Sequence, residues 1–326
     1  MKKRFLGKSN IEIGDVGLGC WQFGGDFGPM AEETAFSIMT TAVEHGITFF
    51  DTADVYGAGR SEKLIGRFLK GCDVSLTVAT KFGRGADIYP NGYTRDNLKG
   101  KVQDSLQRLG VDALDLLQLH CIPKDVLREG EIFDWLRQIK NEGLIKNFGA
   151  SVESVEEAMI CLEQEDLVSL QVIFNIFRQK LITDLFPAAK DRGVGIIVRL
   201  PVASGLLTGK FTAETKFVET DHRNFNRDGQ HFNVGETFAG LPFAKGVQLS
   251  EALKEYVPEG FSLSQMALRW ILDYNTVSVV IPGASSSTQV EENANVSDMR
   301  SLPEELHIQL NEFYNLQVQN HIRGPY

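Results

Sequence analysis

The strongest constraint on the fold is a repeat: a short apolar segment followed by an amphipathic one, eight times along the chain. The short segments are rich in valine, isoleucine and leucine, which is typical of strands buried on both faces of a parallel sheet. Several amphipathic segments end at a glycine, as helices commonly do. Eight alternating units predict an α/β fold, the (β/α)8 TIM barrel. We expect its strands at residues 16–21, 48–51, 76–81, 114–120, 146–151, 170–175, 195–200 and 277–282.

Segments at the two ends lie outside this repeat. Residues 1–15 alternate loosely and predict a small N-terminal β-hairpin that closes one end of the barrel. Residues 288–296 and 303–320 predict additional C-terminal helices. The GxGxxG fingerprint of a doubly wound dinucleotide-binding sheet does not follow the first strand, which favours the barrel. Because no low-complexity linker divides the chain, we expect a single domain over residues 1–326.

The segments between strands carry more detailed predictions. Single helices are expected over residues 126–141 and 181–192. Ser61 and Glu62 form a capping pattern at the start of the helix after the second strand. The connection at 212–240 is longer than structural connections usually are, which predicts either a lid or binding loop, or a disordered segment.

Composition excludes several classes of partner. Apolar residues make up 43% of the chain, enough for a large core. The formal net charge of -10, with no basic cluster, makes nucleic acid and anionic membranes poor partners. No apolar run approaches the ~20 residues of a membrane span, and no secretory signal follows the start MKKRFLGKSN. The four cysteines and six histidines show no metal-ligand spacing, so we expect no metal and a cytoplasmic location. Oligomeric state cannot be read from these features.

Polar residues end three neighbouring predicted strands. Asp51 ends the run TFFD, Lys81 ends LTVATK, and His120 ends LDLLQLH. Tyr56 follows Asp51 closely, at a glycine-rich turn. Because catalytic residues of a TIM barrel stand at the C-terminal ends of its strands, we expect these four side chains at one mouth.

These four residue types together indicate a proton-transfer site. A phenol titrates near ~10 and is a weak acid at neutral pH. We expect the Lys81 ammonium to lower the pKa of Tyr56, and the Asp51 carboxylate to keep Lys81 charged. Tyr56 then becomes a usable proton donor, while His120 orients a substrate oxygen or assists the transfer. A donor aimed at a carbonyl oxygen suits hydride addition, and since no protein group donates hydride, a nicotinamide must lie at the same mouth.

Seven motifs carry a resemblance to a known family: GLGCWQFGG, FFDTADVYGAGRSE, ATKFG, LDLLQLH, GASVES, LPVASGLLTGKF and IPGASSSTQVEEN. Over nearly its whole length the sequence resembles the aldo-keto reductase superfamily, which includes both bacterial reductases and channel-associated β subunits. The resemblance implies a catalytic tetrad of Asp51, Tyr56, Lys81 and His120, with Tyr56 as general acid in the reduction direction.

The resemblance also implies a nicotinamide cofactor, NADPH first and NADH second. Ser151 and Gln171 match positions that hold the nicotinamide carboxamide. Residues 199–210 match a loop that stacks on the ring and wraps the pyrophosphate, and residues 283–293 match the segment at the adenosine end. The implied cofactor contacts are Trp21, Asp51, Ser151, Gln171, Arg199, Leu200, Pro201, Gly205, Leu206, Lys210, Gly283, Ser285, Ser287, Gln289, Glu292 and Asn293.

The sequence departs from the family pattern in three places. Val152 stands where an asparagine often follows the serine, so one carboxamide hydrogen bond is lost. Arg199 replaces the aromatic residue that commonly stacks on the nicotinamide, and a guanidinium can stack on a planar ring as well. The stretch 283–293 lacks the basic residue that often pairs with the 2′-phosphate of NADP, although Ser285 and Ser287 could hydrogen-bond it.

The resemblance further implies a substrate pocket lined by Trp21, Tyr56, Phe82 and His120. Arg84 and Tyr93, which follow the third strand, are additional candidates. Arg60 and Glu62 resemble a structural pair of the family. The tail IRGPY either borders the pocket or forms a flexible end.

The predicted function is an NAD(P)H-dependent oxidoreductase that interconverts a carbonyl (aldehyde, ketone or sugar) and an alcohol on a small molecule. One alternative is a regulatory subunit that binds the cofactor but turns over little. Another is an aldolase barrel in which Lys81 forms a Schiff base. The sequence of the loops does not reveal the substrate.

Overall fold

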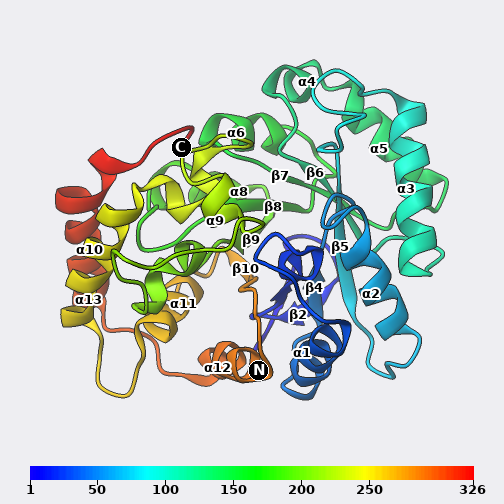
Figure 1. Cartoon of the computed structure of the whole chain (residues 1–326). Coiled ribbons are helices and arrows are strands. Elements are labelled where there is room, and N and C mark those ends of the chain that lie inside the picture. The colour runs from blue at the N-terminus through cyan, green and yellow to red at the C-terminus, as the bar shows by residue number, and fades with distance from the viewer.

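In the computed structural model of residues 1–326, eight parallel strands run in chain order around a barrel (Figure 1). Isolated bridges between Val16 and Val280 and between Gly19 and Gly283 join the first strand to the last. The predicted TIM barrel is confirmed. Its strands are β3 (Leu18–Gly19), β4 (Phe49–Asp51), β5 (Thr77–Phe82), β6 (Leu116–His120), β7 (Phe148–Ser151), β8 (Ser169–Ile173), β9 (Gly195–Arg199) and β10 (Val277–Val280).

Helices surround the strands on the outside (Figure 1). Their apolar residues recur at helical spacing: α5, for example, buries Ile132, Phe133, Leu136 and Ile139 against the barrel. The helices are α1 (Glu32–Glu44), α2 (Arg60–Leu69), α3 (Arg95–Leu109), α4 (Lys124–Glu129), α5 (Glu131–Asn141), α6 (Val155–Leu162), α7 (Leu181–Asp184), α8 (Phe186–Asp191), α9 (His222–Phe225), α10 (Phe243–Leu253), α11 (Leu263–Leu272), α12 (Ser287–Asn295) and α13 (Glu304–Phe313). No helix has the length and apolar character needed to cross a membrane.

The core has two parts that reflect the alternation of side chains along each strand. A cluster of 75 buried residues fills the space between strands and helices. A second cluster of nine lies inside the barrel and includes Phe49, Ala79 and Leu116. The hairpin of β1 (Lys3–Phe5) and β2 (Glu12–Gly14) adds Leu6 and Ile13 to it. The N-terminal end of the barrel is therefore closed by apolar packing, as predicted, and polar chemistry is left to the other end.

Several predicted helix boundaries are wrong. The helix expected over 126–141 is divided into α4 and α5 at Gly130, which has a φ of 82°. The helix expected over 181–192 is also two helices, because Pro187 opens α8 and cannot continue α7. The last helix ends at Phe313 and is followed by a π-helical turn, Tyr314–Val318.

The capping role predicted for Ser61 and Glu62 is also wrong. Helix α2 begins at Arg60, after Gly59, and has no side-chain cap. Both residues are fully buried instead. Glu62 accepts hydrogen bonds from Thr80 of β5 and from Arg108 of α3, so it fastens the helical layer to the strand that carries Lys81.

The long connection 212–240 is folded across the mouth of the barrel, where α9 lies in front of the strands in Figure 1. Its course is fixed by side chains that bond within it: Asn226 donates to Thr237, and Asp221 pairs with Arg223. The His222 backbone amide donates to the Asp26 carbonyl of the loop after β3. The connection is therefore folded rather than disordered, and its role as a lid or binding loop stays a prediction.

We predict that Arg108→Ala destabilises the fold by roughly 3 kcal/mol, because the fully buried Glu62 carboxylate then loses its charged partner. The matched control is Arg128→Ala, which breaks ion pairs between exposed side chains and is expected to cost about 1 kcal/mol or less. Urea unfolding monitored by circular dichroism measures both. Equal effects of the two substitutions would contradict a structural role for the Arg108–Glu62 pair.

Candidate active site

Three of the four predicted tetrad residues are joined by the Lys81 ammonium. Its Nζ donates to Asp51 Oδ1 at 2.5 Å, to the Thr52 carbonyl at 2.8 Å and to Tyr56 Oη at 3.2 Å. The side chains of Lys81 and Asp51 are only 1% and 4% exposed. Because β4 and β5 pair in parallel, with Asp51 the last residue of β4 and Lys81 the next-to-last of β5, the barrel itself brings the charges together.

The turn that carries Tyr56 is held from two sides. Gly57 adopts a φ of +59° and lies against Gly24 of the preceding loop, where a Cβ on Gly24 would come within 2.7 Å of the Gly57 nitrogen. Ser61 accepts a hydrogen bond from the Thr52 hydroxyl at 2.8 Å. These contacts fix the turn and so position the phenol. Ser61 supports the active site in this way, although its sequence pattern predicted a helix cap.

Two glutamines hold the other side of the Asp51 carboxylate. Gln118 Nε2 donates to Asp51 Oδ2 at 3.0 Å, and Gln171 Nε2 donates to the same oxygen at 2.7 Å. Gln171 also donates to Gln118 Oε1 at 3.2 Å. Gln118 was not predicted. The sequence does contain a signal for this role. Gln118 is a polar residue in the apolar strand LLQLH, two positions before His120 and therefore on the same inward face.

His120 stands beside the phenol at the end of β6. Its ring lies 5.9 Å from that of Tyr56 at an angle of 85°. Burial lowers the pKa of His120 well below its ordinary value, and the nearby charges of Lys81, Arg84 and Arg199 lower it further. The imidazole is therefore neutral at physiological pH, with one ring nitrogen able to donate to a substrate oxygen.

The pKa of Tyr56 differs from the prediction. Burial raises it to about 12, and the neighbouring Lys81 lowers it only in part because Asp51 offsets that charge. Burial also lowers the pKa of Lys81, but Asp51 and Tyr56 raise it more, so the ammonium stays protonated. Tyr56 is thus a neutral phenol hydrogen-bonded to a permanent cation. Such a phenol still protonates an alkoxide, which is a much stronger base.

A cavity of about 350 Å³ extends from the tetrad toward α12. The structure places most of the predicted cofactor residues on its wall. These are Trp21, Asp51, Gln171, Arg199, Leu200, Pro201, Gly205, Lys210, Gly283, Ser285, Gln289, Glu292 and Asn293.

Three predicted cofactor residues do not line this cavity. Ser151 is buried, and its hydroxyl lies 3.6 Å from the Cys121 sulfur. Leu206 belongs to the core and packs on α10. The Ser287 hydroxyl lies 2.9 Å from that of Ser37 on α1. The cofactor contacts of these three side chains stay predictions.

The residues of this cavity fit a nicotinamide dinucleotide. Gln171 uses its amide nitrogen within the protein, which leaves its carbonyl oxygen for a carboxamide. Lys210 lines the wall, and the N-terminus of α12, which favours anions, is close by. The loop after β9 adopts strained left-handed conformations at Leu200 and Ser204, of the kind found at ligand sites.

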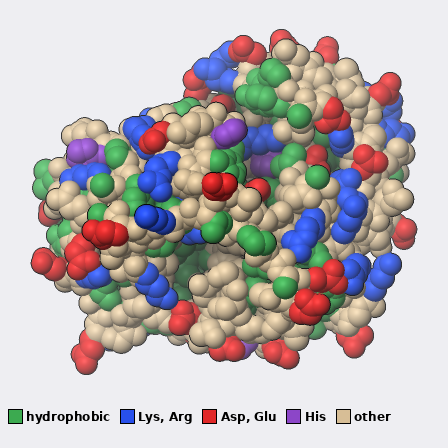
Figure 2. Space-filling view, in the orientation of Figure 1, with side chains coloured by type: hydrophobic (Ala, Val, Ile, Leu, Met, Phe, Trp, Pro, Cys, Tyr) green, Lys and Arg blue, Asp and Glu red, His purple; other side chains and the backbone are tan.

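A second cavity, of about 590 Å³, opens beside the first. The two meet at Trp21, Tyr56, His120 and Glu236, which line both. Figure 2 shows the mouth hollowed here, with hydrophobic, basic and histidine side chains in the hollow. The wall consists of Trp21, Asp26, Val55, Tyr56, Arg84, Tyr89, His120, Glu153, Asp228, Gly229, His231, Phe232, Asn233, Val234, Glu236 and Pro325.

Phe82, predicted as a substrate contact, lines neither cavity. Successive side chains of a strand point to opposite faces, so Phe82 faces the helices because Lys81 faces the barrel interior. Its ring is buried in the core beside Tyr93, whose hydroxyl donates to the Gly83 carbonyl. Of the candidates after β5, only Arg84 reaches the wall of the cavity.

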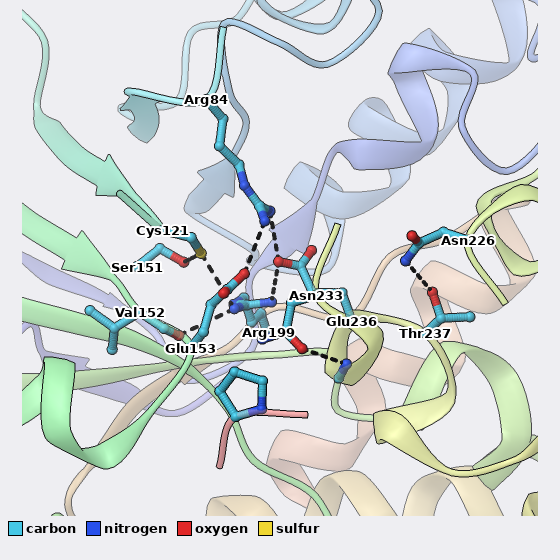
Figure 3. Close-up of polar contacts among 12 residues, drawn as sticks. Arg84, Cys121, Ser151, Val152, Glu153, Arg199, Asn226, Asn233, Glu236 and Thr237 are labelled. Atoms are coloured by element: carbon cyan, nitrogen blue, oxygen red, sulfur yellow. Dashed lines mark hydrogen bonds and ion pairs between the residues drawn. The ribbon is translucent and has the colours of Figure 1, made fainter. Parts of the chain in front are cut away.

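Arg84 belongs to a charged cluster that sequence reasoning missed (Figure 3). Its Nη1 donates to Glu236 at 2.7 Å and its Nη2 to Glu153 at 2.9 Å. Arg199 lies 3.5 Å from the same Glu236 carboxylate and donates to the Val152 carbonyl. Glu236 comes from the long connection, whose path over the barrel no local pattern could reveal.

The two carboxyls of this cluster differ in their pKa. Burial and the neighbouring Glu236 raise the pKa of Glu153 to about 7. Burial also opposes ionisation of Glu236, but contacts with Arg84 and Arg199 lower its pKa to about 2. Ligand atoms of Cys121, Glu153 and Glu236 lie within 4.8 Å of one another, yet the two guanidiniums already occupy the carboxylates, which disfavours a metal cation there.

The tail is docked, which corrects the prediction of a flexible end. Tyr326 lies 4.2 Å from the Arg178 guanidinium, and its hydroxyl accepts from the Lys180 amide. Arg323 donates to the Gly240 carbonyl. It is Pro325, not Arg323 or Tyr326, that lines the substrate cavity. The predicted Arg60–Glu62 pair is likewise not formed, since Arg60 donates to backbone carbonyls instead.

Residues 15–315 match the model of the aldo/keto reductase family. The chain belongs to this family. It is 30% identical over 311 residues to the uncharacterized oxidoreductase YqkF of Bacillus subtilis, covering 94% of each chain. It is 28% identical over 316 residues to a probable voltage-gated potassium channel subunit beta of Arabidopsis thaliana, covering 92% of each. The solved glycerol dehydrogenase AKR11B4 of Gluconobacter oxydans superposes with a TM-score of 0.80 at 27% identity, covering 99% of this chain and 98% of that one. This aldo-keto reductase is therefore an oxidoreductase.

We predict that Glu153→Gln becomes more stabilising, relative to the wild type, as pH rises. The folded pKa of Glu153 is raised from an ordinary 4.5 to about 7, so the unfolded chain releases this proton first and the wild type loses stability across that window. The difference in free energy of unfolding should grow by roughly 1–3 kcal/mol between about pH 5 and about pH 8. Urea titrations measure it. The control Glu163→Gln, at an exposed position, should show no such change.

Proposed function

We propose that this aldo-keto reductase uses NAD(P)H to interconvert a carbonyl and an alcohol on a small molecule, with Tyr56 as the proton donor. The observation that carries the proposal is the hydrogen bond from Lys81 to Tyr56 at the point where the two cavities meet. The long cavity has the residues for a dinucleotide, and the second has room for a small substrate. One hydride and one proton are consumed for each carbonyl reduced.

The bound nicotinamide would supply the hydride. The side chains of this protein do the rest. Tyr56 gives its proton to the carbonyl oxygen as negative charge develops there, and the resulting phenolate is stabilised by Lys81 at 3.2 Å. Asp51, fixed by Gln118 and Gln171, keeps Lys81 protonated in a site that would otherwise favour the neutral amine.

His120 has a positioning role in this scheme. As a neutral imidazole it donates one hydrogen bond to the substrate oxygen without adding a competing positive charge. Its ring also forms part of the wall between the two cavities. The carbonyl is therefore held between His120 and Tyr56, facing the cofactor cavity.

NADPH is the preferred cofactor in this proposal, with NADH as the alternative. Lys210 would face the pyrophosphate, and Glu292 and Asn293 the adenosine end. The 2′-phosphate would be met by the start of α12 and by the Ser285 hydroxyl, which would donate to the phosphate in place of its present acceptor, Gln289. All four cysteines are free, which agrees with a cytoplasmic, reducing location.

We predict that Tyr56→Phe lowers kcat about 10²- to 10⁴-fold, because it removes the proton donor and leaves the ring. Cofactor affinity, measured by quenching of tryptophan fluorescence, should change little. Tyr256→Phe, far from both cavities, is the matched control and should retain activity. Nicotinamide absorbance measures turnover on a panel of aldehydes, ketones and sugars. Full activity of Tyr56→Phe would exclude the proposed role.

The same assay separates the two alternatives. A regulatory subunit, as the similarity to the channel subunit beta favours, would bind the cofactor and show negligible turnover on the whole panel. A Schiff-base aldolase would become covalently labelled at Lys81 when borohydride is added with a carbonyl substrate. We expect turnover and no label.

We predict that NADPH binds more tightly than NADH and that Ser285→Ala lowers the ratio of the two affinities about tenfold, since it removes the hydroxyl proposed to donate to the 2′-phosphate. Thr288→Ala, on an exposed position of the same helix, serves as the control. Fluorescence titration with each dinucleotide measures the affinities. Equal affinities, or tighter binding of NADH, would reverse the cofactor order.

A further inference from the structure

We infer that Glu236 balances the affinity of this site for the oxidised and the reduced nicotinamide, by neutralising Arg199 beside the ring. The inference rests on the proposed function and goes beyond it, since it concerns which form of the cofactor the protein favours. It is carried by the place of Arg199 on the cofactor cavity, by the two guanidiniums that share Glu236 and by the pairing of the other charges there.

Arg199 stands at the reacting end of the cofactor cavity. It is the last residue of β9 and lines this cavity together with Tyr56 and His120. Its guanidinium lies 3.6 Å from the sulfur of Cys121, the residue that follows His120. A nicotinamide that passes hydride to a carbonyl held by Tyr56 and His120 must bring its ring to this end of the cavity. The ring and the guanidinium are therefore neighbours.

The two redox forms of the ring differ in charge. The oxidised nicotinamide carries a positive charge and the reduced one carries none, whereas the rest of the dinucleotide is the same in both. A cation beside the ring therefore weakens binding of the oxidised form, and an anion strengthens it. The effect is strong here because the side chains of Arg199 and Glu236 are only 11% and 8% exposed, so that their charges are little screened.

Glu236 supplies the anion that offsets Arg199. One oxygen of its carboxylate, Oε1, lies 3.5 Å from Arg199 Nη1 and accepts from Arg84 Nη1 at 2.7 Å (Figure 3). The side chain lines both cavities, so its charge lies near the ring as well as near the substrate. Its backbone is held independently, because the Ser204 hydroxyl donates to the Glu236 carbonyl and accepts from the Phe238 amide. An amide in place of the carboxylate therefore removes the charge and keeps this anchor of the connection.

The other charges near the tetrad are already paired within the protein. Lys81 is bound by Asp51 at 2.5 Å, and Arg223, which also lines the cavity, is bound by Asp221 at 2.6 Å. Lys210 is proposed to face the pyrophosphate, which is the same in both forms of the cofactor. The charge beside the ring therefore depends on the one remaining ionic cluster.

Ratios of dissociation constants test the inference. Glu236→Gln and Arg199→Gln are made singly and together on a Glu153→Gln background, in which the neighbouring carboxyl is absent and cannot take over the offsetting charge. Quenching of tryptophan fluorescence gives Kd for NADP+ and NADPH, and for NAD+ and NADH. We expect Glu236→Gln to raise the ratio of Kd for the oxidised form to Kd for the reduced form at least about fivefold. Arg199→Gln should lower this ratio by a similar factor, and the two together should restore the background value.

The opposite signs separate an effect of charge from damage to the site, since a distorted cavity weakens binding of both forms and leaves their ratio near its starting value. Glu163→Gln on the same background, at an exposed position, is the charge-matched control and should leave the ratio unchanged. An unchanged ratio in Glu236→Gln or in Arg199→Gln, or a shift opposite to the expected one, would overturn the inference and leave the proposed function standing. If circular dichroism shows that one variant is unfolded, the other decides by the same criterion. Failure of the wild type to bind any of the four dinucleotides would instead overturn the proposed function.

Discussion

The buried ion pair between Lys81 and Asp51 is the interaction on which the rest of the site depends. Removing either partner of such a pair leaves a buried charge that costs about 3–5 kcal/mol. The pair is positioned by the barrel, because both residues lie at the C-terminal ends of two strands that pair in parallel. Gln118 and Gln171 satisfy the second carboxylate oxygen, and the Thr52 carbonyl takes another ammonium hydrogen. With these bonds in place, the phenol of Tyr56 has a fixed cation beside it.

A second ionic cluster connects this centre to the long connection over the barrel mouth. Glu236 lies at the boundary of the two cavities and is bound by Arg84, which follows β5, and by Arg199 at the end of β9. The connection therefore contributes a wall to both sites, and its departure would leave two partly buried guanidiniums without the Glu236 carboxylate. Ser204 strengthens the attachment, since it donates to the Glu236 carbonyl and accepts from the Phe238 amide.

The sequence predicted the barrel well because its strongest signal, the repeated strand and helix, is local. The approach of Asp51, Lys81 and His120 followed from one rule, that strand ends of a barrel share a face. A second rule, that successive side chains of a strand point to opposite faces, would have placed Phe82 on the face turned away from the pocket. Glu153 follows β7 closely and could have been found by the first rule. Glu236 and Pro325 could not, because their positions depend on the path of a long connection and a tail. The pKa of Tyr56 could not be predicted either, since it depends on the balance between burial and the opposite charges of Lys81 and Asp51.

Arg199 shows why the two clusters have to be considered together. In the proposed complex it lies where an aromatic ring commonly stacks on the nicotinamide. An isolated guanidinium there would favour the neutral reduced ring over the positively charged oxidised one, and would bias the reaction. Glu236 at 3.5 Å and the Val152 carbonyl at 3.2 Å offset much of that charge. The guanidinium can then act as a flat polar surface whose electrostatic effect is small. A residue of the long connection therefore helps the barrel to use arginine at a position where the family commonly uses an aromatic side chain.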